Sequence, residues 1–350
     1  MNKKRESEPA FLTPIGEEEE SSYSKVFQGK PINAYISSSS RESEEDQITG
    51  VSKIQSEGVI ITFDRQLSPN VINPLTFKAL IILLTIATKQ LPSREAITDE
   101  LINRGRKVKI SVRDYKEACA LNDTKTAREQ LNRVIRALST INFEWDETDG
   151  KSKHHYSMPL AGLVITEESK VIQNGVAEFW LNFDMAKYLC NAYIMPYNPA
   201  LLTISTHSNP ASLPMGWKLT ALHNMNQDKP NSEKTTVKTL LKAAENSIPR
   251  YEDIAAIGGI YERITKPFHR DMEALVTAGI LETFDYFDAD WHLVLPEKLK
   301  SLSFKEFQAL NIQYIIKDYP AISPRQIEKR RRLREARNKK SKKKDTQEEA

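Results

Sequence analysis

The sequence is poor in cysteine, with only Cys119 and Cys190 among its 350 residues. Two distant thiols without metal-ligand spacing exclude a disulfide framework and suit a reducing compartment. No Gly-x4-Gly-Lys-Ser/Thr loop is present, which argues against an ATP-driven helicase or loader. The six histidines show no spacing to cysteine or carboxylate that is typical of a metal site. We therefore expect no metal, no cofactor and no enzymatic activity.

Long hydrophobic runs are also missing. The longest, residues 75–87, contains Lys78 and is shorter than the roughly 20 residues that a membrane span requires. The first 20 residues contain no apolar stretch of signal-peptide length. We expect a soluble cytoplasmic protein that does not associate with a membrane.

The charges nearly cancel over the whole chain, with 50 Lys and Arg against 47 Asp and Glu, but they are unevenly distributed. Residues 1–50 hold ten acidic and six basic groups, whereas residues 325–350 hold twelve basic and five acidic groups. The ends also lack hydrophobic periodicity, which favours disorder. We predict a disordered, acidic, Ser/Glu-rich head over residues 1–55 and a basic, disordered tail over residues 319–350.

Hydrophobic periodicity predicts a first domain over residues 56–175. Its expected strands are 58–64, 107–112, 141–145 and 154–166, and its expected helices are 75–90, 93–103, one beginning at 111 and one over 122–138. The segment DETDGKSK supplies an Asp-Gly hairpin turn between the last two strands. This order, a helix-turn-helix followed by a β-hairpin, is that of a winged helix.

A similar order recurs over residues 176–318. The expected elements are a strand at 176–183, helices at 183–191, 210–227, 233–245 and 263–280, a hairpin of 281–287 with 291–296, and an αα extension at 303–318. Pro267 is acceptable in the first turn of its helix, and Gly279 suits the position just past the end. The predicted fold class is α+β, with two tandem winged-helix domains between the disordered tails.

The helix predicted from NDTKTAREQLNRVIRAL (122–138) has two different faces. Its apolar stripe consists of Ala127, Leu131, Val134, Ile135 and Leu138. A second row, spaced three, four and four residues apart, consists of Lys125, Arg128, Asn132 and Arg136. Between residues 104 and 136 the chain holds ten basic and four acidic groups, so this row belongs to a basic region. Arg can read guanine and Asn can read adenine in the major groove, whereas the alternative is an ordinary solvated helix face.

The candidate DNA contacts form three groups. In the first unit they are Lys107, Lys109, Arg113, Lys125, Arg128, Asn132, Arg133 and Arg136, with Lys151 and Lys153 on the predicted wing. In the second unit they are Lys234, Lys238, Lys266, His269 and Arg270. In the tail, nonspecific phosphate contacts are expected from Lys329, Arg330, Arg331, Arg332, Arg334 and Arg337.

Each group has an alternative reading. Asp146, Glu147 and Asp149 precede the wing turn, so a compensated salt network fits that turn as well as DNA contact. The second unit also suits dimer or partner binding, and the tail could act in nuclear localisation or solubility. His154 and His155 precede Tyr156, a combination that some nicking enzymes use. Adjacent residues of a strand point to opposite faces, which argues against a shared catalytic site.

The sequence resembles plasmid replication initiators of the tandem winged-helix type. The resemblance covers roughly residues 57–300 and rests on ISVRDYKEACALNDTKTAREQLNRVIRALSTINFEW, FWLNFDMAKYLCNAYIMPYNPALLTI and HRDMEALVTAGIL. It implies binding to repeated duplex sites at an origin, with recruitment of a host initiator, helicase or primase. It also implies a homodimer form that represses its own gene. The long acidic head and the basic tail depart from the family pattern.

We therefore predict a replication initiator that binds specific double-stranded DNA sites. The alternative with the same fold is a winged-helix transcriptional repressor or partition-type regulator, which would act at a single operator. A nicking or priming enzyme and a protein-interaction scaffold are further alternatives from other classes.

Overall fold

The computed structural model describes residues 23–36, 38, 44–45, 51–64, 73–149, 152–163, 172–227, 229, 232–245 and 251–320. The strands are β1 Ser24–Gln28, β2 Glu44–Glu45, β3 Val51–Ser56, β4 Val59–Asp64, β5 Lys107–Ser111, β6 Asn142–Asp149, β7 Ser152–Pro159, β8 Ala161–Leu163, β9 Ile172–Gln173, β10 Val176–Leu181, β11 Tyr193–Tyr197, β12 Lys234–Thr236, β13 Leu281–Phe287 and β14 Asn311–Ile316. The helices are α1 Lys30–Ile36, α2 Pro74–Gln90, α3 Asp99–Gly105, α4 Val112–Ala118, α5 Thr124–Ser139, α6 Phe183–Asn191, α7 Ser212–Asn226, α8 Val237–Ala244, α9 Tyr251–Ile257, α10 Lys266–Thr277 and α11 Phe304–Ala309.

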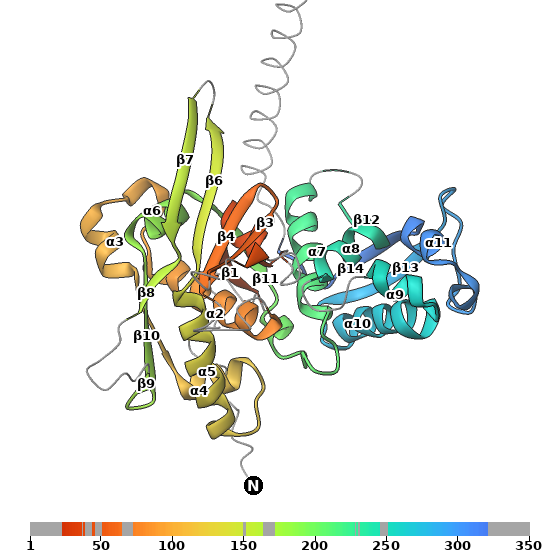
Figure 1. Ribbon diagram of the computed structural model, residues 1–350, viewed down its shortest axis with the longest axis horizontal. Coiled ribbons are helices and arrows are strands. Elements are labelled where there is room, and N and C mark those ends of the chain that lie inside the picture. Colours follow the sequence, from red (N-terminus) through yellow and green to blue (C-terminus); the bar gives the residue numbers. More distant parts are fainter. Residues whose placement is uncertain are drawn as a thin grey trace, which may run out of the picture.

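Two units lie side by side, and Figure 1 shows α2 and α5 in one and α7 and α10 in the other. Helix α2 is the central helix of the first unit. Asn73 caps it by accepting hydrogen bonds from the backbone N–H groups of Leu75 and Thr76, and Pro74 occupies its first turn. Every residue of α2 from Thr76 to Ala87 is buried, as its continuous apolar sequence predicts.

The predicted helix-turn-helix is confirmed in α4 and α5. Ser111 caps α4 by accepting from the N–H of Asp114, and Asp123 caps α5 by accepting from the N–H of Thr126. Between the helices, Ala120 adopts a positive φ of 50° and turns the chain. The apolar stripe of α5 is buried and packs against α2 and α4.

The sheet that completes this winged helix has the order β5-β10-β8. Strand β10 pairs with β5 from Val176 to Trp180 and with β8 from Phe179 to Leu181. The expected domain boundary between residues 175 and 176 is therefore wrong, because it separates β10 from the two strands that flank it. The alternation of the 176–181 segment correctly predicted a strand, but a short strand does not reveal its hydrogen-bonding partners.

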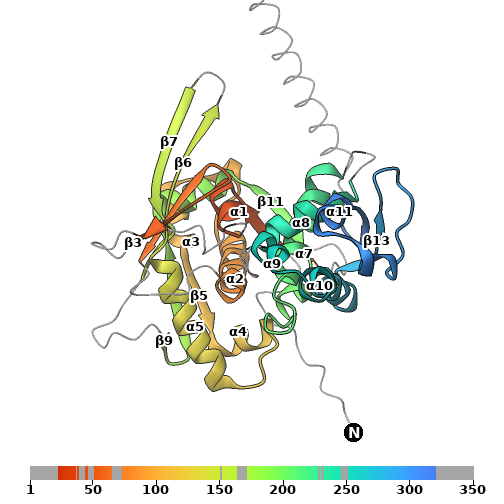
Figure 2. The ribbon, with the colours of Figure 1, turned by 45° about the vertical axis from the view of Figure 1, so that its right-hand side comes forward.

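The β6–β7 hairpin belongs to a different sheet, with the order β2-β3-β4-β6-β7. The long strand expected over residues 154–166 is broken at Leu160 into β7 and β8, which lie in separate sheets. Figures 1 and 2 show β6 and β7 projecting well beyond the rest of the first unit. The hairpin that pairs with β5 is β8–β10, so in position it is the wing. The expectation from the sequence that β6–β7 is the wing is therefore wrong.

The second unit repeats the winged-helix order with α7, β12, α8, α9, α10, β13 and β14. Its sheet has the order β12-β14-β13. Two expectations are wrong here. Strand β13 pairs with β14 rather than with residues 291–296, which contribute only a single bridge between Phe287 and Leu293. The expected αα extension is one short helix, α11, followed by β14, whose alternating burial marks a strand.

The predicted disordered head is also partly wrong. Residues 24–28 form β1, which pairs with β11, and residues 30–36 form α1, whose Ile32, Ala34 and Tyr35 are fully buried. Packing against elements distant in the sequence orders this polar-rich segment, which has no periodicity of its own. The predictions for residues 1–22 and 321–350 lie outside the described residues.

Several contacts join the two units. The Nζ atom of buried Lys78 on α2 donates to the carbonyl oxygen of Ile204, 2.6 Å away, in the segment that leads to α7. Burial lowers the pKa of this ammonium group. Asn198 donates to the carbonyl of Gly279, and the Tyr23 hydroxyl donates to the carbonyl of Lys317.

Candidate nucleic-acid interface

The polar row of α5 lies on a different face of the helix from its buried stripe. Lys125 and Arg128 are exposed, and Asn132 and Arg136 are half-buried. The Nε atom of Arg136 donates to Oδ1 of Asn132 at 3.4 Å, so these two side chains form one polar pair along the helix. The predicted row is therefore present as a continuous surface.

Lys125 and Arg128 make no ion pair within the described part of the chain. The nearest acidic residue before them in sequence, Asp123, is engaged elsewhere, because its carboxylate accepts from the N–H and hydroxyl of Thr126 at 2.6 and 2.8 Å. These hydrogen bonds lower the pKa of Asp123. No described carboxylate, Glu129 included, forms an ion pair with either cation, so both are available to an external anion.

The neighbouring cations of the first unit are compensated. Lys107 and Lys109 on β5 both contact Glu178 on β10, at 2.9 and 3.0 Å. Hydrogen bonds from the two ammonium groups hold the pKa of Glu178 at about 2, well below its ordinary value. Arg113 pairs with Glu117 one turn along α4, at 2.8 Å. These pairs could be found only from the fold, because β5 and β10 are about 70 residues apart in sequence.

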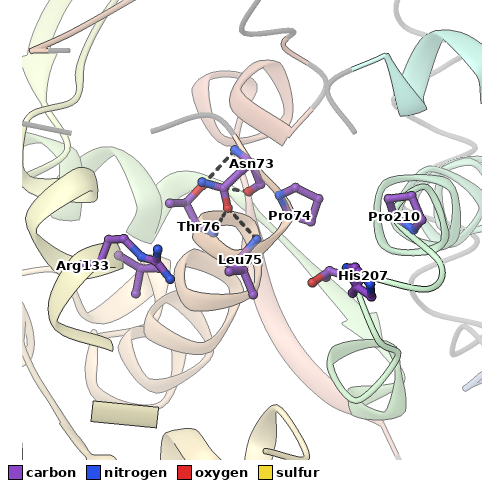
Figure 3. A pocket seen from close by; sticks show the side chains of 9 residues that line it. Asn73, Pro74, Leu75, Thr76, Arg133, His207 and Pro210 are labelled. Carbon is purple, nitrogen blue, oxygen red and sulfur yellow. Dashed lines mark hydrogen bonds between the residues drawn. The ribbon is translucent and has the colours of Figure 1, made fainter. Parts of the chain in front are cut away.

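Arg133 lies off the row and lines a pocket of about 390 Å³ between the two units. Figure 3 shows Arg133 on one side of the amino-terminal end of α2, with His207 and Pro210 on the other. The pocket is also lined by Asn73, Pro74 and Thr76. Asn73 and Thr76 form hydrogen bonds with each other in the α2 cap. Arg133 is the arginine of the pocket lining.

The β6–β7 hairpin carries both signs of charge. Lys151 lies outside the described residues, and Lys153 is exposed. His155 lies between two carboxylates, with Nδ1 2.9 Å from Asp146 and Nε2 3.6 Å from Glu144. Within the described part of the hairpin, His155 therefore contacts two carboxylates, next to the exposed Lys153.

The candidate contacts of the second unit are mostly paired. Lys266 contacts Glu262 at 2.7 Å, and Arg270 lies 3.6 Å from Asp271. His269 lies 3.3 Å from both Glu273 and the Tyr286 hydroxyl, so its ring is directed towards β13. On the preceding elements, Lys234 packs over the Trp291 ring while Lys238 is exposed.

Asp271 is a structural residue that the sequence analysis did not identify. It is fully buried, and its carboxylate accepts from the backbone N–H of Ala211 at 3.1 Å, while its own carbonyl accepts from the Ser212 hydroxyl. Desolvation raises its pKa to about 6, although the Ala211 hydrogen bond and Arg270 oppose that rise. Asp271 thereby fastens α10 to the start of α7. The sequence does not predict this role, because nothing distinguishes a single aspartate beside the predicted contact Arg270 from an exposed one.

Among the residues that the structure describes, Asp288, Asp290 and His292 have side chains close enough to share a cation. Oδ1 of Asp288 already accepts from the backbone N–H groups of Asp290 and His292, at 3.0 and 2.9 Å. The Asp288 carboxylate therefore stabilises the turn, which explains its position without a bound cation.

The fold and the α5 surface define a winged-helix protein with two tandem units. Residues 81–195 match the family model "Initiator Replication protein, WH1". The match extends from α2 to β11 and therefore includes β10, which the sequence analysis placed in the other domain. This part of the chain therefore matches a family of winged-helix replication initiators, in agreement with the resemblance seen in the sequence.

Among solved structures, the chain is similar to domains 2 and 3 of RctB. The sequence identity is 12% and the TM-score 0.43, with 81% of this chain and 98% of that chain covered. No curated protein matches the sequence. In the part of the chain that the structure describes, no helix combines the length and apolar character needed to cross a bilayer.

Proposed function

We propose that this chain initiates replication by binding duplex DNA at repeated origin sites, with the exposed face of α5 in the major groove. One observation carries the proposal. Lys125 and Arg128 are exposed cations on the polar row of the second helix of a helix-turn-helix, and they have no carboxylate partner among the described residues. The second helix of such a motif normally presents its polar face to the major groove.

The polar row of α5 contains side chains that can contact DNA phosphates and side chains that can contact base edges. Phosphate contacts by Lys125 would fix the orientation of the helix, and they carry no sequence information. Arg128, Asn132 and Arg136 are side chains that can reach base edges, and a good bidentate contact contributes about 1–3 kcal/mol of discrimination. Binding by this face requires no cofactor.

The second unit and the tail would add further contacts. Lys238, Lys266 and Arg270 would contact a second part of the site, and the basic tail would add salt-dependent affinity without sequence preference. Because the chain lacks a nucleotide-binding loop, DNA opening would depend on recruited host proteins such as an initiator, helicase or primase. A homodimer that represses its own gene belongs to the same proposal.

A footprint on DNA flanking the chain's own gene tests the proposal. We expect the purified protein to protect several directly repeated sites, and we expect these sites to stay protected after removal of residues 325–350. Protection of one site only would favour the winged-helix repressor. Loss of all protection with the tail would show that the α5 face does not read DNA.

A further inference from the structure

The turn after β13 holds an aromatic side chain in an unfavourable backbone conformation. Trp291 has a φ of 61°, in the left-handed region that bulky residues rarely occupy. Its N–H donates to the carbonyl of Asp288 at 3.2 Å, and the Asp288 carboxylate accepts from two further N–H groups of the turn. Asn311 on β14 donates to the same Asp288 carbonyl at 3.0 Å. These bonds stabilise a conformation that would otherwise cost on the order of 1–3 kcal/mol.

The turn exposes three large apolar side chains. Trp291 is 40% exposed, Leu293 55% and Leu295 57%, whereas Val294 between the leucines is buried. Large apolar groups grouped on a surface mark an interaction site more often than isolated ones do. We call residues 281–297 the acidic wing.

The acidic wing has a charge opposite to that expected of a DNA-contacting wing. It contains five carboxylates, Glu282, Asp285, Asp288, Asp290 and Glu297, and no lysine or arginine, and the exposed Lys298 and Lys300 follow it directly. All five except Asp288 are exposed. These carboxylates would repel phosphate and attract a basic partner.

One cation already occupies this surface. The Nζ atom of Lys234 lies 4.0 Å from the centroid of the Trp291 ring, a cation–π contact. Lysine and arginine also bury their methylene stems along apolar groups while keeping their charged ends in contact with acids or water. Leu293 and Leu295 beside Asp290 therefore suit a segment rich in lysine and arginine.

We propose that the acidic wing is the docking surface for the chain's own basic tail, residues 329–344 (KRRRLREARNKKSKKK). Asn311 at the start of β14 pairs with Phe287 within the acidic wing, and the described chain ends at Pro320. At about 3.3 Å per residue, Pro320 is at most roughly 30 Å from Asn311, and residues 321–329 can span a similar distance. The tail's basic run can thus reach the wing of its own molecule.

If the tail docks, the carboxylates of the acidic wing and the phosphates of DNA compete for its basic side chains. Docking would lower the affinity of the tail for nonspecific DNA, and a high local concentration of phosphate would displace the tail from the acidic wing. This consequence rests on the proposed DNA binding, whereas the docking itself does not.

Carbodiimide cross-linking of the full chain without DNA tests the docking. This reagent joins carboxylates to lysines that already lie in contact, and mass spectrometry identifies the pairs. We expect cross-links from Asp285, Asp290 and Glu297 to the lysines of residues 339–344. We expect them within one molecule, as a mixture of isotopically light and heavy chains would show. Glu252 and Asp253 on α9, which are equally exposed, are the control carboxylates. Equal cross-linking of the controls, or cross-links only between molecules, would overturn the proposal.

A second measurement uses the fluorescence of Trp291. We expect the emission of the full chain to shift to the red when the tail is removed. The shift should disappear in Trp291→Phe and should also be produced by high salt. An Asp285→Asn, Asp290→Asn double variant should bind random duplex several-fold more tightly than the wild type, and only when the tail is present. Emission that does not respond to the tail would refute the docking, whereas cross-links and a red shift without any DNA binding would refute only the proposed function.

Discussion

Lys125 and Arg128 differ from Lys107, Lys109, Arg113, Lys266 and Arg270 in having no carboxylate partner among the described residues. A paired cation must lose its partner before it can bind phosphate, and an unpaired one need not. The value of each side chain for DNA binding therefore depends on its neighbours as much as on its charge.

Replacement of Arg128 by alanine should weaken binding to the cognate site about 10- to 100-fold, the factor that corresponds to one base contact. Binding to random duplex should weaken much less. Arg113→Ala, which removes the same charge from an arginine paired with Glu117, is the matched control and should have a small effect on both. Equal losses on cognate and random duplex in a gel-shift titration would reduce Arg128 to a phosphate contact.

Asp271 should make the stability of the second unit depend on pH. Its folded pKa of about 6 lies above its ordinary value of 3.8, so the folded state binds the proton more tightly than the unfolded state does. Its contribution is therefore fully present below pH 4 and is lost as the pH rises through 6. The lost contribution is up to about 3 kcal/mol.

The Asp271→Asn variant keeps an oxygen for the Ala211 N–H and does not titrate. We expect its free energy of unfolding to rise relative to that of the wild type between pH 4 and pH 7. Denaturant titrations at a series of pH values measure the difference. Asp253→Asn, at an exposed position, should show no such trend. Parallel stability curves for the wild type and Asp271→Asn would contradict the assignment.

The contact between α2 and α3 depends on close approach of their backbones at Gly105, and not only on the hydrophobic periodicity of the two helices. Gly105 ends α3 against the end of α2, where an added β-carbon would lie 2.6 Å from the carbonyl oxygen of Gln90 and 3.1 Å from Cα of Leu91. Both contacts are with backbone, which cannot rotate away as a side chain can.

The Gly105→Ala substitution should therefore destabilise the protein by on the order of 1–3 kcal/mol, the usual result of overpacking. This loss should exceed the gain in helix propensity of up to about 1 kcal/mol. Arg104→Ala, at the exposed neighbouring position, is the control and should have little effect. An unchanged midpoint of urea unfolding for Gly105→Ala would show that α2 and α3 can separate without loss.

The whole molecule is organised by strand pairing between distant segments. Strand β10 lies between β5 and β8, and β11 pairs with β1. The first winged helix therefore requires residues beyond 175.

A fragment covering residues 23–209 should unfold cooperatively, whereas a fragment covering residues 23–175 should not. The shorter fragment lacks β10, and with it the buried Phe179 and Leu181 and the hydrogen bonds to β5. Thermal unfolding followed by circular dichroism measures the difference. A cooperative transition with the same midpoint in both fragments would show that the first domain folds without β10, as a boundary at residue 175 requires.

Local patterns in the sequence were sufficient to predict most helices. The apolar run of α2, the capped stripe of α5 and the end of α10 at Gly279 follow from periodicity and capping alone. The start of α10 does not, because a π-helical turn, Tyr261–Thr265, runs directly into it before Pro267. Gly279 has the expected positive φ of 70°. The polar row of α5 is equally local, because residues three and four apart share a helix face in any fold.

Tertiary structure alone decided which strands pair and which charges are free. The separation of β6–β7 from β8–β10, the pairing of β13 with β14 and the ordering of β1 and α1 all depend on contacts between distant segments. The same contacts pair Lys107 and Lys109 with the single carboxylate of Glu178 and bury Asp271 against α7. Helical hydrogen bonds join residues close in sequence, whereas strand and ion pairs join residues at any separation. The sequence therefore determined the helices and their faces, and the fold decided the sheets and the available charge.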